Sequence, residues 1–99
     1  MAAYKLTNKA VEDLNHIWEY TIYKWSERQA DSYYNLLLDS CHNIADNPSL
    51  GRNYDGLKKE LLGVKTNRHI IFYRKTSGEY VEITRILNER TDLMNGLEE

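Results

Sequence analysis

Two apolar stripes with the spacing of an α-helix fill the first half of the chain, and one short break separates them. In the break, Ser26 is followed three residues later by Gln29, the pattern of a capping box at the start of a second helix. Pro48 ends that helix, because the residue before a proline avoids helical angles. Two helices joined by so short a turn form an antiparallel hairpin. The stripes are Val11, Leu14, Ile17, Trp18, Thr21, Ile22 and Trp25, and then Ala30, Tyr33, Leu37, Cys41 and Ile44.

The remainder of the chain has the pattern of strands, which supply the second layer that the hairpin needs. Residues 4–6 alternate, and Thr7 or Asn8 then caps the first helix, with Glu12 and Asp13 in its first turn. A loop over 49–56 precedes three strands over 61–66, 68–75 and 80–87. We therefore predict an α+β fold of order β-α-α-β-β-β, with a short α turn in the polar tail 88–99. The hairpin packs on a mainly antiparallel sheet.

The size and composition indicate one domain over residues 1–99, with a core over about 4–93. The single cysteine, Cys41, lies on the second apolar stripe and is expected in the core, so we expect a reducing, cytoplasmic location. No apolar run reaches the roughly 20 residues that span a bilayer. The three histidines lack metal-ligand spacing and no phosphate-binding glycine loop is present, so we expect no metal or cofactor. The histidines are His16, His42 and His69.

Aromatic residues on the first helix divide into two groups. Trp18 and Trp25 lie one heptad apart on the apolar stripe, so we expect them to pack against the sheet, although a binding groove is the alternative. Tyr20 and Tyr23 fall outside the stripe and should be exposed. Exposed tyrosines are good interface anchors, because the ring buries area while the hydroxyl stays hydrogen-bonded.

Two strand arginines are the most informative polar residues. Arg85 alternates with Val81, Ile83 and Leu87, which predicts that it shares their face of the sheet. Arg68 alternates in the same way with residues 70 and 72. An arginine beside an apolar face must reach a carboxylate or the rim, so each forms either a structural ion pair or a site for phosphate or an acidic peptide. For Arg85, Glu60, Glu82 and Asp92 are candidate partners.

The charge is uneven along the chain. Residues 51–75 hold seven basic and two acidic residues, whereas the whole chain has a net charge of −2. A basic middle segment can meet an acidic partner or nucleic acid, or it can be a solvated sheet edge where lysines prevent aggregation.

Five blocks of the sequence, in order, resemble the ParE toxins of the RelE/ParE superfamily. The resemblance runs from about Tyr4 to Leu93. It implies a helical hairpin over an antiparallel sheet, which is the fold predicted above. The blocks are YKLTNKAVEDLNHIWEYT, WSERQA, NPSLGR, RHIIFYR and VEITRILNERTDL.

The resemblance implies a toxin of a type II toxin–antitoxin system, acting in plasmid or chromosome stability. Such a toxin inhibits DNA gyrase rather than catalysing a reaction, and a ParD-like antitoxin neutralises it in a hetero-oligomer. The resemblance implies no membrane partner and no direct nucleic-acid binding by the free toxin. Arg85, Arg90, Asp92 and Leu93 are then the candidate contacts to the target. The candidate contacts to the antitoxin are Tyr20, Tyr23, Lys58, Lys59, Lys65 and Arg68.

Two alternatives stay open. The RelE branch of the superfamily contains ribosome-dependent mRNA endonucleases, and Arg68 and Arg85 resemble arginine positions of that branch. The ending Asn88-Glu89-Arg90-Thr91-Asp92 offers no His or Tyr as acid or base, which favours ParE. The second alternative is an inactive binding relic that keeps the fold.

Overall fold

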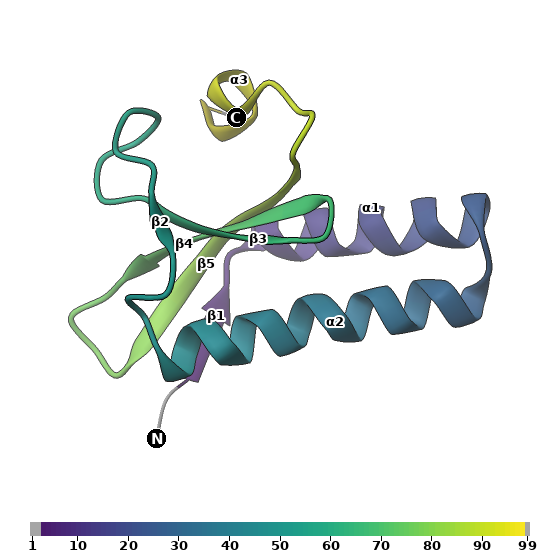
Figure 1. Cartoon of the computed structure of the whole chain (residues 1–99), viewed down its shortest axis with the longest axis horizontal. Helices are drawn as coiled ribbons and strands as arrows, with labels where there is room; N and C mark the ends of the chain where they lie inside the picture. Colours follow the sequence, from purple (N-terminus) through teal and green to yellow (C-terminus); the bar gives the residue numbers. More distant parts are fainter. Residues whose placement is uncertain (1–2, 99) are drawn as a thin grey trace.

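The computed structural model describes residues 3–98, which form a helical hairpin and a five-stranded sheet (Figure 1). The strand order is β1-β5-β4-β3-β2. β1 pairs with β5 in parallel and the other pairs are antiparallel, so the predicted α+β class and mainly antiparallel sheet are confirmed. The elements are β1 (Ala3–Leu6), α1 (Asn8–Lys24), α2 (Glu27–Asp46), β2 (Arg52–Asn53), β3 (Leu62–Thr66), β4 (His69–Lys75), β5 (Tyr80–Asn88) and α3 (Leu93–Glu98).

Both long helices begin at the residues that the sequence indicates. The side chains of Thr7 and Ser26 each accept a hydrogen bond of 3.1 Å from the backbone N–H three residues on, at Ala10 and Gln29. These bonds satisfy amides that would otherwise have no partner in the first turn. Because α1 starts at Asn8, Glu12 and Asp13 lie beyond its first turn, so that expectation was wrong.

One face of the sheet packs against α1 and α2. The first helix contributes Ala10 and Leu14, and the second contributes a longer row that includes Cys41. Burial of Cys41 is confirmed, and it raises the pKa of the thiol to about 12. The buried residues of this first core are Ala10, Leu14, Leu37, Cys41, Ile44, Ala45, Ile71, Tyr73, Val81, Ile83 and Ile86.

The opposite face of the sheet has a smaller core of its own. Figure 1 shows α3 on the other side of the sheet from α1 and α2. Leu97 of α3 packs there against the outward side chains of β4 and β5, and the segment between β2 and β3 adds Leu61. Both faces of the sheet are therefore covered. The buried residues of this second core are Leu61, Ile70, Phe72, Leu87 and Leu97.

An irregularity in β5 changes the face on which Arg85 lies. Tyr73 pairs with Ile83 and Phe72 pairs with Arg85, so Thr84 is an extra residue on β5. Such a bulge reverses the alternation beyond it. Arg85 therefore lies on the α3 side with Phe72 and Leu87. The prediction that it shares a face with Leu87 is confirmed, but the prediction that it shares one with Val81 and Ile83 was wrong.

Two further expectations differ from the structure. The predicted loop contains the two-residue strand β2, which pairs with Leu62 and Gly63. Trp25 is 70% exposed instead of buried, because it caps the end of α1 at the hairpin turn, beyond the sheet. Trp18 is half-buried, and its indole N–H donates to Asp31 at 3.1 Å.

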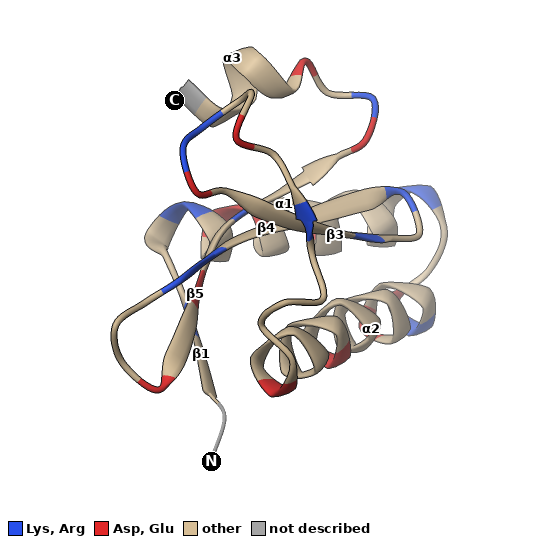
Figure 2. Ribbon diagram, turned by 60° about the vertical axis from the view of Figure 1, so that its left-hand side comes forward, with Lys and Arg blue, Asp and Glu red and all other residues tan. Residues whose placement is uncertain are grey.

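The basic residues of the middle segment are distributed over β2, β3, β4 and the loops between them. Figure 2 shows where Lys and Arg, and Asp and Glu, lie along the ribbon of the whole chain. Within residues 3–98, no helix is long and apolar enough to cross a membrane.

Candidate functional site

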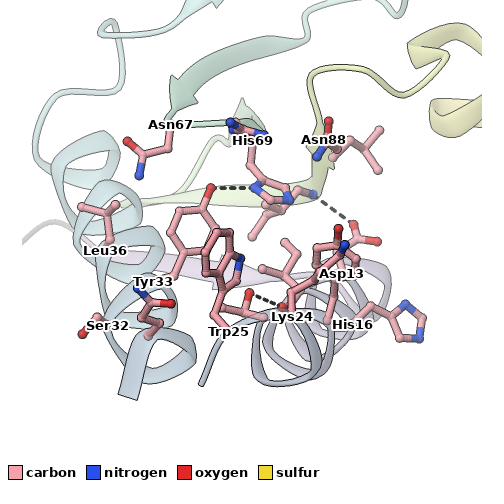
Figure 3. A pocket seen from close by; sticks show the side chains of 17 residues that line it. Asp13, His16, Lys24, Trp25, Ser32, Tyr33, Leu36, Asn67, His69 and Asn88 are labelled. Atoms are coloured by element: carbon pink, nitrogen blue, oxygen red, sulfur yellow. Dashed lines mark hydrogen bonds between the residues drawn. The ribbon is translucent and has the colours of Figure 1, made fainter. Parts of the chain in front are cut away.

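A groove lies where the C-terminal half of α1 and the N-terminal half of α2 extend past the sheet. Its floor comes from one face of the two helices, and its wall comes from the β3–β4 turn and the end of β5 (Figure 3). The volume is about 1150 Å³. A space of this size and openness suits a segment of another chain better than a small metabolite.

The floor of the groove is rich in exposed apolar groups. Tyr20 is 60% exposed, Trp25 is 70% exposed and Leu36 is 38% exposed. Large apolar side chains that remain accessible side by side mark an interaction surface, whereas scattered ones do not. The exposure predicted for Tyr20 and Tyr23 is confirmed, but Tyr23, at 87% exposed, lies outside the groove lining.

Tyr33 and His69 form the polar centre of the groove. The hydroxyl of Tyr33 lies 2.6 Å from Nδ1 of His69 and 3.4 Å from the carbonyl of Thr66 (Figure 3). Burial lowers the pKa of His69, and the nearby carboxylates of Asp13 and Glu89 oppose this only in part. Burial also raises the pKa of Tyr33. Both groups are therefore neutral at pH 7, and the pair joins α2 to the start of β4.

The residues proposed from the sequence to contact an antitoxin separate into several places. Tyr20 and Arg68 line the groove. Lys65 points from β3 to Glu89, 3.4 Å away, in an exposed ion pair. Lys58 and Lys59 lie in the segment between β2 and β3, where Lys58 donates to the carbonyl of Leu97 at 3.1 Å.

Arg85 connects three elements instead of projecting into solvent. Its Nε and Nη2 donate to the two carboxylate oxygens of Asp13 at 2.8 and 3.0 Å, and its Nη1 donates to the carbonyl of Gly96 at 2.6 Å. Asp13 also accepts the backbone N–H of Ile86 at 3.0 Å. The side chains of Arg85 and Asp13 are 15% and 12% exposed. The ion-pair alternative therefore holds, with Asp13 as partner in place of the acidic residues suggested above.

The other proposed target contacts lie between β5 and α3. Arg90 and Asp92 are exposed, and Asp92 accepts a bond from the Asn95 side chain at 2.9 Å. Leu93 is half-buried against the second core. Arg90 follows Asn88, which lines the groove, by two residues. This stretch is thus an accessible segment beside the groove.

Sequence reasoning missed three residues that organise this site. Asp13 was taken as a first-turn charge and Tyr33 as a core residue, and His69 was noted only as lacking metal-ligand spacing. Because Tyr33 is 36 residues before His69, no local sequence pattern indicated that the two side chains would meet. Within the described residues, no group of three His, Cys, Asp or Glu side chains could hold a metal ion.

Comparison with known proteins agrees with this architecture. The family model described as the ParE toxin of the type II toxin–antitoxin system parDE matches residues 4–93. This chain belongs to the ParE toxin family. It is 33% identical over 89 residues to toxin ParE1 of Caulobacter vibrioides, covering 90% of this chain and 91% of that protein.

Two other similarities extend over almost the whole chain. It is 31% identical over 97 residues to toxin ParE of Escherichia coli, covering 98% of this chain and 94% of that protein. A solved structure described as the chromosomal ParDE TA system from P. aeruginosa superposes with a TM-score of 0.77 at 17% identity. The superposition covers 89% of this chain and 96% of the solved chain, so this ParE toxin has the same fold as that structure.

Proposed function

We propose that this ParE toxin inhibits DNA gyrase and that a ParD-like antitoxin silences it by placing a segment in the groove of α1 and α2. The observation that carries the antitoxin proposal is the groove itself, which combines an open volume of about 1150 Å³ with accessible apolar side chains. An amphipathic helix of the antitoxin would lay its apolar face on Tyr20, Trp25 and Leu36. An acidic residue of that helix would pair with Arg68 at the rim.

The position of the groove suggests how binding would silence the toxin. Asn88 lines the groove, and Arg90 and Asp92 follow it in the exposed segment before α3. We propose this segment as the contact to gyrase, with Arg90 as its accessible cation. Arg85, in contrast, supports the segment by holding α3 to α1 and β5. An antitoxin in the groove would then obstruct gyrase sterically.

The nuclease alternative has less support. Arg68 lines the groove, whereas Arg85 is paired with Asp13 and lines a different cavity. A pair of cations that stabilises one cleaved phosphate has to converge on it. The geometry therefore supplies no joint site for these two arginines.

The direct experiment adds the purified chain to gyrase and a relaxed plasmid. We expect loss of supercoiling and accumulation of cleaved plasmid held by gyrase, and we expect Arg90→Ala to weaken both. Lys59→Ala is the control, because it removes an exposed charge outside the groove and the Arg90 segment. Unaltered gyrase activity, with cut transcripts after induction in cells, would move the assignment to the nuclease branch. No effect in either assay would indicate an inactive relic.

A further inference from the structure

A second, smaller cavity lies on the α3 side of the sheet, away from the groove. It is about 360 Å³ in volume, near the lower end of the range for small-molecule sites. The beginning of α1, strands β4 and β5, and α3 surround it. Among the described residues that line it, four have cationic side chains and none has a carboxylate; the cations are Lys9, Lys58, Arg74 and Arg85.

Among the described side chains, only one of these four cations forms an ion pair. Asp13 pairs with Arg85, and the other ion pair between described side chains joins Lys65 to Glu89. Lys9, Lys58 and Arg74 therefore have no described carboxylate within 4.0 Å. The hydrogen bond from Lys58 goes to the neutral carbonyl of Leu97, and no carboxylate that the structure describes forms an ion pair with it.

Arg74 supplies the most specific sign of a missing acceptor. Its Nε is buried and has no hydrogen-bond partner among the described residues. A buried N–H without an acceptor is destabilising, and in native proteins such a group usually has a protein, water or ligand partner. Arg74 lines the cavity, so an anion there would lie beside its guanidinium group.

The end of α1 adds a second source of positive potential. The hydroxyl of Thr7 accepts from Ala10, but the N–H groups of Asn8 and Lys9 have no hydrogen bond among residues 3–98. Thr7, Asn8 and Lys9 all line the cavity. Free amides at a helix start favour anions, because the helix dipole is positive there.

We propose that this cavity binds a phosphate group, either inorganic phosphate or the phosphate of a nucleotide. A phosphate carries oxygen acceptors on every side, which matches the guanidinium of Arg74, the ammonium groups of Lys9 and Lys58, and the first amides of α1. Because Leu97 of α3 and Lys58 close one side, the bound anion would also tie α3 to the body of the protein.

The test titrates the purified full chain with inorganic phosphate at constant ionic strength and follows the backbone amides of Asn8 and Lys9 by NMR. We expect saturable shifts of both amides. Arg74→Gln should weaken phosphate binding about tenfold or more, as expected for loss of a charge-assisted hydrogen bond. Adenosine monophosphate is the second probe: tighter binding than phosphate identifies a nucleotide site, and equal or weaker binding identifies a site for the free anion.

Two neighbouring lysines provide the matched control. Lys58→Gln and Lys59→Gln remove the same charge from adjacent positions, but only Lys58 lines the cavity. We expect Lys58→Gln to weaken phosphate binding several-fold and Lys59→Gln to leave it within about twofold. Equal effects of the two variants, or linear shifts without saturation, would overturn the proposal. This comparison decides the matter even if Arg74→Gln does not fold, and it needs neither antitoxin nor gyrase.

Discussion

At the scale of single residues, Asp13 and Arg85 hold together parts of the chain that are far apart. They are separated by 72 residues in the sequence, yet they form a two-bond ion pair with little exposure to water. The same arginine reaches the carbonyl of Gly96, and the same carboxylate receives the N–H of Ile86. This network fixes α1, β5 and α3 relative to one another.

We expect Arg85→Ala to lower the free energy of unfolding by about 2–4 kcal/mol, because it leaves the Asp13 carboxylate without its cation in a partly buried place. Urea unfolding followed by circular dichroism measures this change. Lys65→Ala is the comparison, since its ion pair with Glu89 is exposed and should contribute less than about 1 kcal/mol. Equal losses in the two variants would contradict a structural role for Arg85.

His69 should make stability depend on pH. Its pKa in the fold lies below the ordinary value of 6.5 because of burial, so the unfolded chain takes up this proton first as the pH falls. Its contribution to stability is complete above the ordinary pKa and is lost as the pH falls from there toward the folded pKa.

We therefore expect the wild-type chain to lose more stability than His69→Gln between about pH 7.5 and pH 5. Urea midpoints at the two pH values measure the difference. The same loss in both proteins would show that other groups, and not His69, determine the pH dependence in this range.

At the scale of helices and strands, the capping of α2 is the feature most directly encoded. Ser26→Ala removes the acceptor of the Gln29 N–H and should lower the free energy of unfolding by about 1 kcal/mol. Ser32→Ala, at an exposed position within the same helix, should have no destabilising effect, because alanine is the better helix former. A stability loss from Ser32→Ala as large as that from Ser26→Ala would contradict the capping argument.

The elements could be predicted from the sequence wherever a local pattern defines them. The helix caps, the apolar stripe of α2 and the strands β3 and β4 depend on residues within a few positions of one another, and each was confirmed. The bulge at Thr84 and the strand β2 could not be predicted, because both depend on the register between strands. For the same reason, the prediction that Arg85 shares a face with Val81 and Ile83 was wrong.

The candidate site was only partly predictable. The helical wheel located Tyr20 on the exposed side of α1, and its exposure was confirmed. The contact between Tyr33 and His69, and that between Asp13 and Arg85, join distant segments and leave no local signal. Trp25 lies on the apolar stripe, but the hairpin extends past the sheet there, so the stripe has nothing to cover it.

At the scale of the whole molecule, the sheet separates two sites of different character. The open groove on the hairpin side is apolar at its floor, whereas the small cavity on the α3 side is cationic. The exposed segment at Arg90 lies between them along the chain, after Asn88 of the groove and before α3. Our account therefore assigns antitoxin binding to the groove and target contact to the neighbouring segment.

Growth after induction of the toxin, with and without coexpression of its ParD-like antitoxin, tests this account most directly. The variants are the double substitution Tyr20→Ala and Arg68→Ala in the groove, and Lys59→Ala as a control. The sequence suggested Lys59 as an antitoxin contact, but it does not line the groove, so the groove proposal expects no effect there. We expect all three proteins, wild type included, to stop growth when expressed alone. The antitoxin should restore growth for the wild type and Lys59→Ala but not for the groove variant. Full rescue of a groove variant that is toxic alone would contradict the assignment of the antitoxin to the groove.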